Sequence, residues 1–284
     1  MRLVRRLSTG VKLTRDSLRV LRREPSLAVF PLLGGGITLA VGAVAYLAVF
    51  VADLVDGWLT LVALFGLYFV TTFVASFFTA ALVAAVADVF RGQDPTLRAG
   101  LAAAWDVKGA LAVWSAISAL VGVVLRLLER SESLLSRYVA GLFAIGWTLT
   151  TFFVVPVIVF EDVSVRGLFT TSAATFRDTW GETLGSNFGI GLLQVVVWLA
   201  GVAAAVAVGI GLFNLVPWVG TSTVILGVVG VTVAVYLVGR TVDGIVRTAL
   251  YVYAADRTVP PAFAEFDFET LEGRTRSDDE ASTE

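Results

Sequence analysis

Two arginines and an aspartate near the end of the longest uncharged run are the residues best suited to bind a ligand. Arg240, Asp243 and Arg247 lie at positions i, i+3 and i+7, so a helix places them on one face, where Asp243 can pair with either arginine. The pattern supports two interpretations. One is an ion-paired helix end at a membrane interface, with the arginines reaching toward water. The other is a vestibule that attracts anions.

Three consecutive glycines, Gly34, Gly35 and Gly36, form a second candidate site near the start of the first apolar segment. Consecutive glycines weaken a helix and can expose backbone groups, as in the broken helices of transporters. Close packing against a neighbouring helix, or a kink, is the commoner explanation for such glycines. The sequence alone leaves a hinge, a binding position and a packing position open.

Four hydroxyl residues in the second apolar segment fall within helical reach of one another: Thr71, Thr72, Ser76 and Thr79. Together with the glycines they could line a small-solute site, because hydroxyls and backbone carbonyls suffice for an uncoupled pore or carrier. Serine and threonine also serve as hydrogen-bonding residues between membrane helices. The packed interface is the commoner role of such residues, and the transport site is the alternative.

Several kinds of chemistry are ruled out by composition. The chain has no cysteine and no histidine, which removes thiolate nucleophiles, disulfides and the commonest general base and metal ligand. It also lacks the glycine-rich phosphate loop of nucleotide-binding proteins and the HExxH motif of zinc proteases. We therefore expect no enzymatic activity, no cofactor, no metal site and no nucleic-acid partner.

The apolar content predicts an all-α, polytopic membrane protein. Hydrophobic residues make up 57% of the chain, charged residues 15%, and the mean hydropathy is +0.85. We predict about six transmembrane helices in a domain of residues 25–256, with amphipathic surface helices on the cytoplasmic side. Pro156 lies in the last turns of the fourth span, where we expect a kink whose freed carbonyl is satisfied by neighbouring helices. The predicted spans are 27–52, 58–87, 110–128, 138–160, 188–213 and 221–239, the last with a helical extension to 255.

The two ends of the chain differ in charge. Residues 1–24 carry eight basic side chains between regularly spaced leucines and a valine, the pattern of an amphipathic helix on anionic lipid head groups. A solvated basic arm is the alternative. Residues 257–284 have the composition of an acidic, disordered tail. Since basic residues favour the inner side, we expect a multi-pass protein of the cell membrane with both termini in the cytoplasm.

Four segments carry a resemblance to a known group of proteins: SLRVLRREPSLAVFPLL, FFTAALVAAV followed by RGQDPTL, PVIVFED, and TALYVYA. In this order they resemble an uncharacterised family of multi-span membrane proteins from halophilic archaea, a domain of unknown function. The resemblance implies a fold and a membrane location, and it brings no active site. Only two of the 21 basic residues are lysine, which suits a salt-rich cytoplasm, although a GC-rich genome produces the same bias.

Two functions fit these observations. The first is a non-enzymatic scaffold that organises the membrane or its proteins through amphipathic helices. The alternative is a small-solute permease or channel-like transporter. A polar cavity reaching the middle of the membrane would favour transport, and a solidly packed bundle would favour the scaffold. The sequence identifies no substrate or protein partner, and it does not give an oligomeric state.

Overall fold

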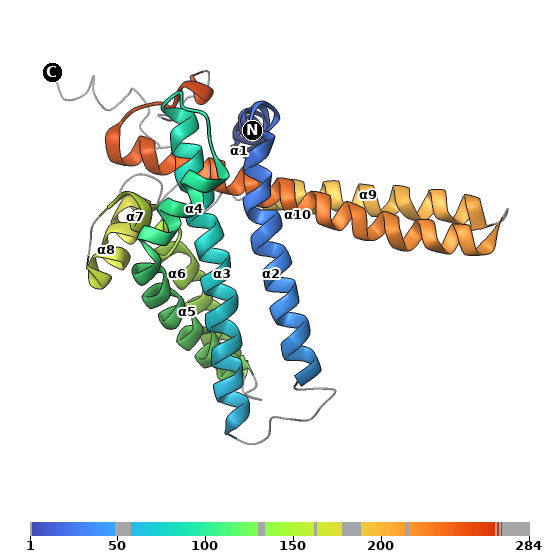
Figure 1. Ribbon diagram of the computed structural model, residues 1–284, viewed down its shortest axis with the longest axis horizontal. Helices are drawn as coiled ribbons and strands as arrows, with labels where there is room; N and C mark the ends of the chain where they lie inside the picture. Colours follow the sequence, from blue (N-terminus) through green and yellow to red (C-terminus); the bar gives the residue numbers. More distant parts are fainter. Residues whose placement is uncertain are drawn as a thin grey trace.

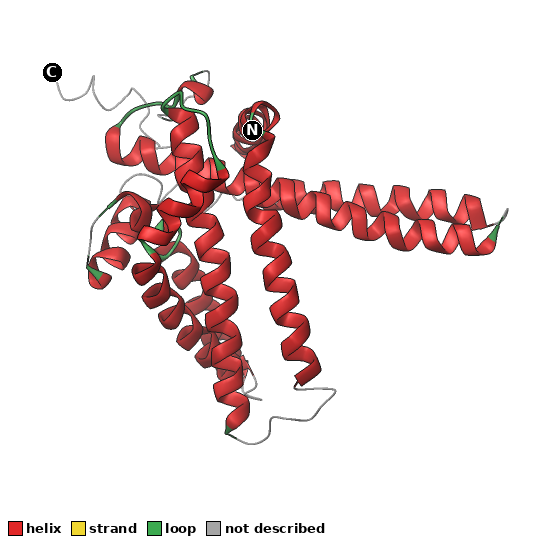
Figure 2. Ribbon diagram, viewed as in Figure 1, coloured by secondary structure: helices red, strands yellow, loops and turns green. Residues whose placement is uncertain are grey.

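The computed structural model describes residues 2–48, 58–129, 134–161, 164–177, 189–213, 216–264, 266 and 268. This part of the chain is almost entirely helical and contains no strand (Figure 2), which confirms the predicted all-α class. Within it, six helical segments are long and apolar enough to cross a membrane, as in a multi-pass membrane protein. They are Pro25–Tyr46, Leu59–Phe90, Lys108–Leu128, Tyr138–Phe160, Gln194–Phe213 and Pro217–Asp256.

Four helices form the main bundle, in which neighbours pack side by side (Figure 1). They are α2 (Val29–Tyr46), α3 (Leu59–Phe90), α5 (Lys108–Glu129) and α6 (Leu134–Thr150). The longest of them, α3, is apolar on all sides, as expected of a helix surrounded by lipid and other helices. The short helix α4 (Leu97–Asp106) starts at Thr96, whose hydroxyl accepts a hydrogen bond from the Ala99 N–H, and it packs against α3.

The last two long helices, α9 (Gly189–Phe213) and α10 (Pro217–Asp256), form a hairpin that extends sideways from the bundle (Figure 1). At 1.5 Å per residue, the 40 residues of α10 span about 60 Å. Its second half is buried in the protein core, whereas most of its first half is exposed. Because α10 is continuous, the buried half fixes the direction of the hairpin. The six predicted spans therefore do not share one direction, since four follow the bundle and two run crosswise to it.

The protein core lies at one end of the bundle. There, α7 (Val154–Phe160) and the second half of α10 pack against α3, and α1 (Arg2–Arg23) and α8 (Val165–Thr175) pack on α10 and α7. Its largest fully buried side chains include Phe30, Phe153, Leu168 and Ile245. The basic segment is helical as predicted, and Leu13 and Val20 on its apolar face are buried in this core. Most of the buried hydrophobic side chains of the described residues thus belong to this one cluster.

The beginning of the predicted disordered tail packs on the same core. Phe263, Phe266 and Phe268 are each at most 5% exposed, and the Phe268 ring stacks on Tyr253 with centroids 4.6 Å apart. Phe263 also meets Phe90 edge to face. The tail boundary predicted at residue 257 is therefore wrong, because three phenylalanines within the acidic composition supply enough apolar surface to dock. Residues 269–284 lie outside the described part of the chain.

The three consecutive glycines do not interrupt their helix, because α2 is continuous through them. A Cβ added at Gly34 would lie 2.9 Å from Phe78 Cβ, and one added at Gly35 would lie 2.8 Å from the Tyr236 ring. At Gly36 no atom lies within 4 Å. Gly34 and Gly35 thus let α2 approach α3 and α10 closely, whereas Gly36 has no such role.

This difference gives a matched pair of substitutions. We expect Gly34→Ala to destabilise the protein by about 1–3 kcal/mol, because the new methyl group overlaps Phe78. We expect Gly36→Ala to be neutral or to stabilise it by up to about 1 kcal/mol, since alanine is the better helix former. Thermal unfolding of the detergent-purified variants measures both effects. Equal shifts would contradict the packing role of Gly34.

Candidate functional site

The candidate site is built around a break in the fourth span. Pro156 has no N–H, so it leaves the carbonyl of Phe152, four residues earlier, without its helical donor. Helix α6 accordingly ends at Thr150, and α7 begins at Val154. Arg247 Nη1 from α10 donates to the Phe152 carbonyl at 3.3 Å. The predicted kink at Pro156 is confirmed, and the donor comes from a neighbouring helix.

A second side chain, Ser172, forms hydrogen bonds to backbone groups at the break. Ser172 on α8 is fully buried; its Oγ donates to the Thr150 carbonyl at 2.7 Å and accepts from the Phe153 N–H at 3.1 Å. Helix α8 starts at Ser164, which caps it by accepting from the Gly167 N–H. The polar stretch after the fourth span therefore folds back and hydrogen-bonds to the end of that span.

The three charged residues predicted to share a face, Arg240, Asp243 and Arg247, lie on α10 and form a trio. The two arginines of this trio contact the aspartate to different extents. Arg247 Nε lies 3.0 Å from Asp243 Oδ2, although its N–H is not aimed at that oxygen and the contact is an ion pair only. The Arg247 guanidinium also lies over the Phe152 ring, 4.4 Å from its centroid. Arg240 Nη1 is 4.0 Å from the same aspartate oxygen, and its side chain is 45% exposed. Arg247 is thus fixed by several contacts, whereas Arg240 is only loosely held.

These three side chains line a partly open cavity of about 330 Å³. Its walls come from α3, α5, the broken fourth span and α10. Trp114 and Trp147 line it with stacked rings, 5.8 Å apart between centroids and 10° apart in plane. Its polar lining consists of Thr72, Ser76, Thr79, Thr148, Thr151, Arg240, Asp243 and Arg247.

Residues near the middle of α3, the longest bundle helix, line the cavity. In α3, which runs from Leu59 to Phe90, Thr72 is the 14th and Thr79 the 21st of 32 residues. A further lining residue, Val83, extends the cavity toward the C-terminal end of α3. The α3 part of the lining thus begins near the middle of the helix and runs toward its C-terminal end.

Most hydroxyl groups in the cavity wall already donate a hydrogen bond to a backbone carbonyl of their own helix. Thr79 donates to the Ala75 carbonyl at 2.7 Å, and Thr148 and Thr151 donate in the same way to residues four positions earlier. Ser76 Oγ accepts from Trp114 Nε1 at 3.1 Å. The charged hydrogen-bond donors of this lining are therefore the guanidinium groups. With two arginines and one aspartate, the trio carries one net positive charge, which a monovalent anion would neutralise.

The structure brings most of the predicted site residues together. Gly34 and Gly35 line a small adjacent pocket of about 30 Å³, which shares Arg240 and Thr79 with the large cavity. Gly36 lines neither pocket. Of the four predicted hydroxyls, Thr71 is also absent from both linings, and it donates to the Leu67 carbonyl instead.

The sequence interpretation missed one wall of the cavity. Thr148, Thr151, Trp114, Trp147 and Phe152 line it without having been predicted. A signal for two of them was present, because the Thr-Leu-Thr-Thr run at 148–151 directly precedes the helix break that Pro156 causes. Nothing in the sequence pattern of α5 distinguishes Trp114 from an ordinary core residue.

The unequal contacts of the two arginines predict unequal effects on stability. We expect Arg247→Met to destabilise the protein by about 1–3 kcal/mol, because it leaves the Phe152 carbonyl without its donor and Asp243 with only the long contact to Arg240. Arg240→Met is the matched control and should change stability by less than about 0.5 kcal/mol, since its ion pair is long and exposed. Thermal unfolding in detergent compares the two. A larger loss from Arg240→Met would contradict this assignment.

Comparison with known proteins identifies a family. No curated protein and no solved structure matches the chain. One family matches residues 58–260, a range that includes every residue lining the large cavity and excludes α1 and α2. Because the match covers more than half of the sequence, the chain belongs to the family of unknown function DUF6159.

Proposed function

We propose that this protein is a permease of channel or carrier type for small monovalent anions and that the large cavity is its binding site. The observation that supports the proposal most strongly is the trio of Arg240, Asp243 and Arg247 in a polar cavity halfway along α3. Charged residues inside a membrane protein are costly, and they usually mark an ion or substrate pathway. The protein would bind and pass its solute without transforming it and without a cofactor.

The two arginines have different roles in this proposal. Arg247 is a positioning residue, because it holds the Phe152 carbonyl and Asp243. Arg240 contacts the anion, because its side chain is loosely paired and partly exposed in the cavity. The stacked Trp114 and Trp147 rings line the same cavity as the three charged residues. Their apolar surface would lower the local dielectric constant and strengthen anion binding.

A membrane-organising scaffold is the second candidate. The α9–α10 hairpin favours it, because this hairpin extends beyond the bundle and exposes large apolar side chains such as Val196, Ile210 and Leu226. Such a surface can pack against lipid or against other membrane helices.

Location and source belong to the same proposal. We propose a cell-membrane protein with both termini in the cytoplasm, supported by the basic N-terminal helix. We also propose that it comes from a halophilic archaeon, because its sequence resembles a family of membrane proteins from such organisms. The scarcity of lysine among its basic residues supports this source.

The orientation predicts opposite labelling at the two ends of α3. Since the chain has no cysteine, single substitutions at the exposed Trp58 and Gln93 give clean labelling sites. In intact cells, a membrane-impermeant maleimide should label Trp58→Cys, and it should label Gln93→Cys only after permeabilisation. The reverse pattern would invert the proposed orientation, and equal labelling would mean that α3 does not cross the membrane.

Anion transport predicts a specific loss of flux. Liposomes containing the protein should take up iodide faster than protein-free liposomes, measured by quenching of an entrapped halide-sensitive dye. We expect Arg240→Gln to slow uptake by about tenfold, the effect of losing roughly 1.4 kcal/mol of anion binding. Arg240→Lys should retain most of the flux because it keeps the charge.

The control for this experiment is Arg23→Gln, which removes an exposed cation far along the chain from the cavity lining. It should leave iodide uptake unchanged. Uptake that is equal in wild type and Arg240→Gln, or no higher than in protein-free liposomes, would reject the permease and favour the scaffold.

A further inference from the structure

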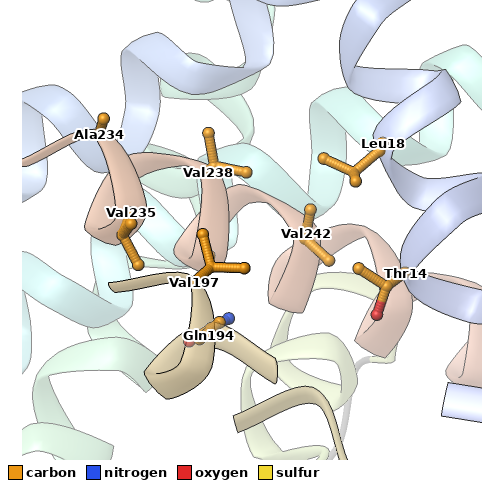
Figure 3. A pocket seen from close by; sticks show the side chains of 9 residues that line it. Thr14, Leu18, Gln194, Val197, Ala234, Val235, Val238 and Val242 are labelled. Carbon is orange, nitrogen blue, oxygen red and sulfur yellow. The ribbon is translucent and has the colours of Figure 1, made fainter. Parts of the chain in front are cut away.

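A second cavity of about 330 Å³ lies between α1, α9 and α10 (Figure 3). Its lining is almost entirely apolar, and its only polar residues are Thr14 from α1 and Gln194 from α9. Its volume is at the lower end of the range for small-molecule sites, about 300–1,000 Å³. The lining residues are Thr14, Leu18, Gln194, Val197, Ala234, Val235, Val238, Gly239 and Val242. We call this cavity the α1 groove.

The α1 groove lies where the apolar hairpin meets charged helix surface. The uncharged run that begins at Thr183 ends at Gly239, which lines the groove, and Arg240 follows directly. On the other side, α1 carries basic residues along its exposed face. An apolar wall beside a basic one is the environment of a phospholipid at the membrane surface, where the acyl chain is apolar and the head group is charged.

Two cations are placed to meet such a head group. Leu18 lines the groove, and Arg15 and Arg22 lie three residues before it and four residues after it, so both neighbour Leu18 on the helix surface. Both arginines are exposed, and no carboxylate of the described residues forms an ion pair with either one. By contrast, Arg19 on the same helix is paired with Asp16 at 3.2 Å.

We infer that the α1 groove binds one anionic phospholipid, with an acyl chain along Val197, Val235 and Val238 and the phosphate between Arg15 and Arg22. This site is separate from the anion cavity, and it stands whether or not the protein transports anions. The opposite charges of the phosphate and the two unpaired arginines favour a lipid over a second copy of the chain, whose corresponding hairpin surface carries no charge.

Native mass spectrometry of the full-length protein in detergent tests the inference, with phosphatidylglycerol and phosphatidylcholine of equal chain length as probes. We expect one phosphatidylglycerol to bind at least about tenfold more tightly than phosphatidylcholine, as expected for two cations near the head group. Arg15→Gln/Arg22→Gln should abolish this preference. The charge-matched control Lys12→Gln/Arg23→Gln, on the exposed face farther from Leu18, should keep it.

A second pair of variants tests the acyl-chain part. Ala234→Trp fills the groove and should weaken phosphatidylglycerol binding by about tenfold. Ala204→Trp, at an exposed position on α9 outside the groove, should not. Equal affinity for both lipids in the wild type would overturn the inference, as would equal effects of the two charge variants or of the two tryptophan variants.

Discussion

The missing N–H of Pro156 is the constraint on which the arrangement of the core and the cavity depends. In a membrane span, an unsatisfied carbonyl costs several kcal/mol, so another element must supply a donor. Arg247 of α10 donates to the Phe152 carbonyl. Ser172 of α8 donates to the Thr150 carbonyl and accepts from the Phe153 N–H. Both helices must therefore cross the end of the fourth span. Their crossing places Asp243 and Arg240, one and two turns before Arg247, in the space beside the break.

The same crossing determines the direction of the hairpin. Because α10 is an unbroken helix, packing its second half across α3 and α7 directs its first half, with α9, away from the bundle (Figure 1). The packed core and the apolar hairpin then meet at α1, whose buried face completes the core and whose Thr14 and Leu18 line the α1 groove. The helix α1 thus contacts both the packed core and the apolar hairpin.

Local features were predictable from the sequence, and directions in space were not. Uncharged runs, the kink at Pro156 and the shared face of Arg240, Asp243 and Arg247 depend only on residues close in the chain. The crosswise path of α10 depends on contacts between residues far apart in the chain, such as the hydrogen bond from Arg247 to the Phe152 carbonyl, 95 positions away. Gly34, Gly35 and Gly36 look alike in sequence, yet only the first two face another helix closely. Likewise, the docking of Phe263, Phe266 and Phe268 depends on a surface that α3 and α10 create together.

Anomalous diffraction from bromide-soaked crystals is the most direct test of whether the cavity binds a small anion. An ordered bromide between α3 and α10, within about 4 Å of the Arg240 guanidinium, is the result we predict. The same peak should be absent from crystals of Arg240→Gln. Bromide found only on the outer surface of the protein, with the cavity empty, would contradict an anion site.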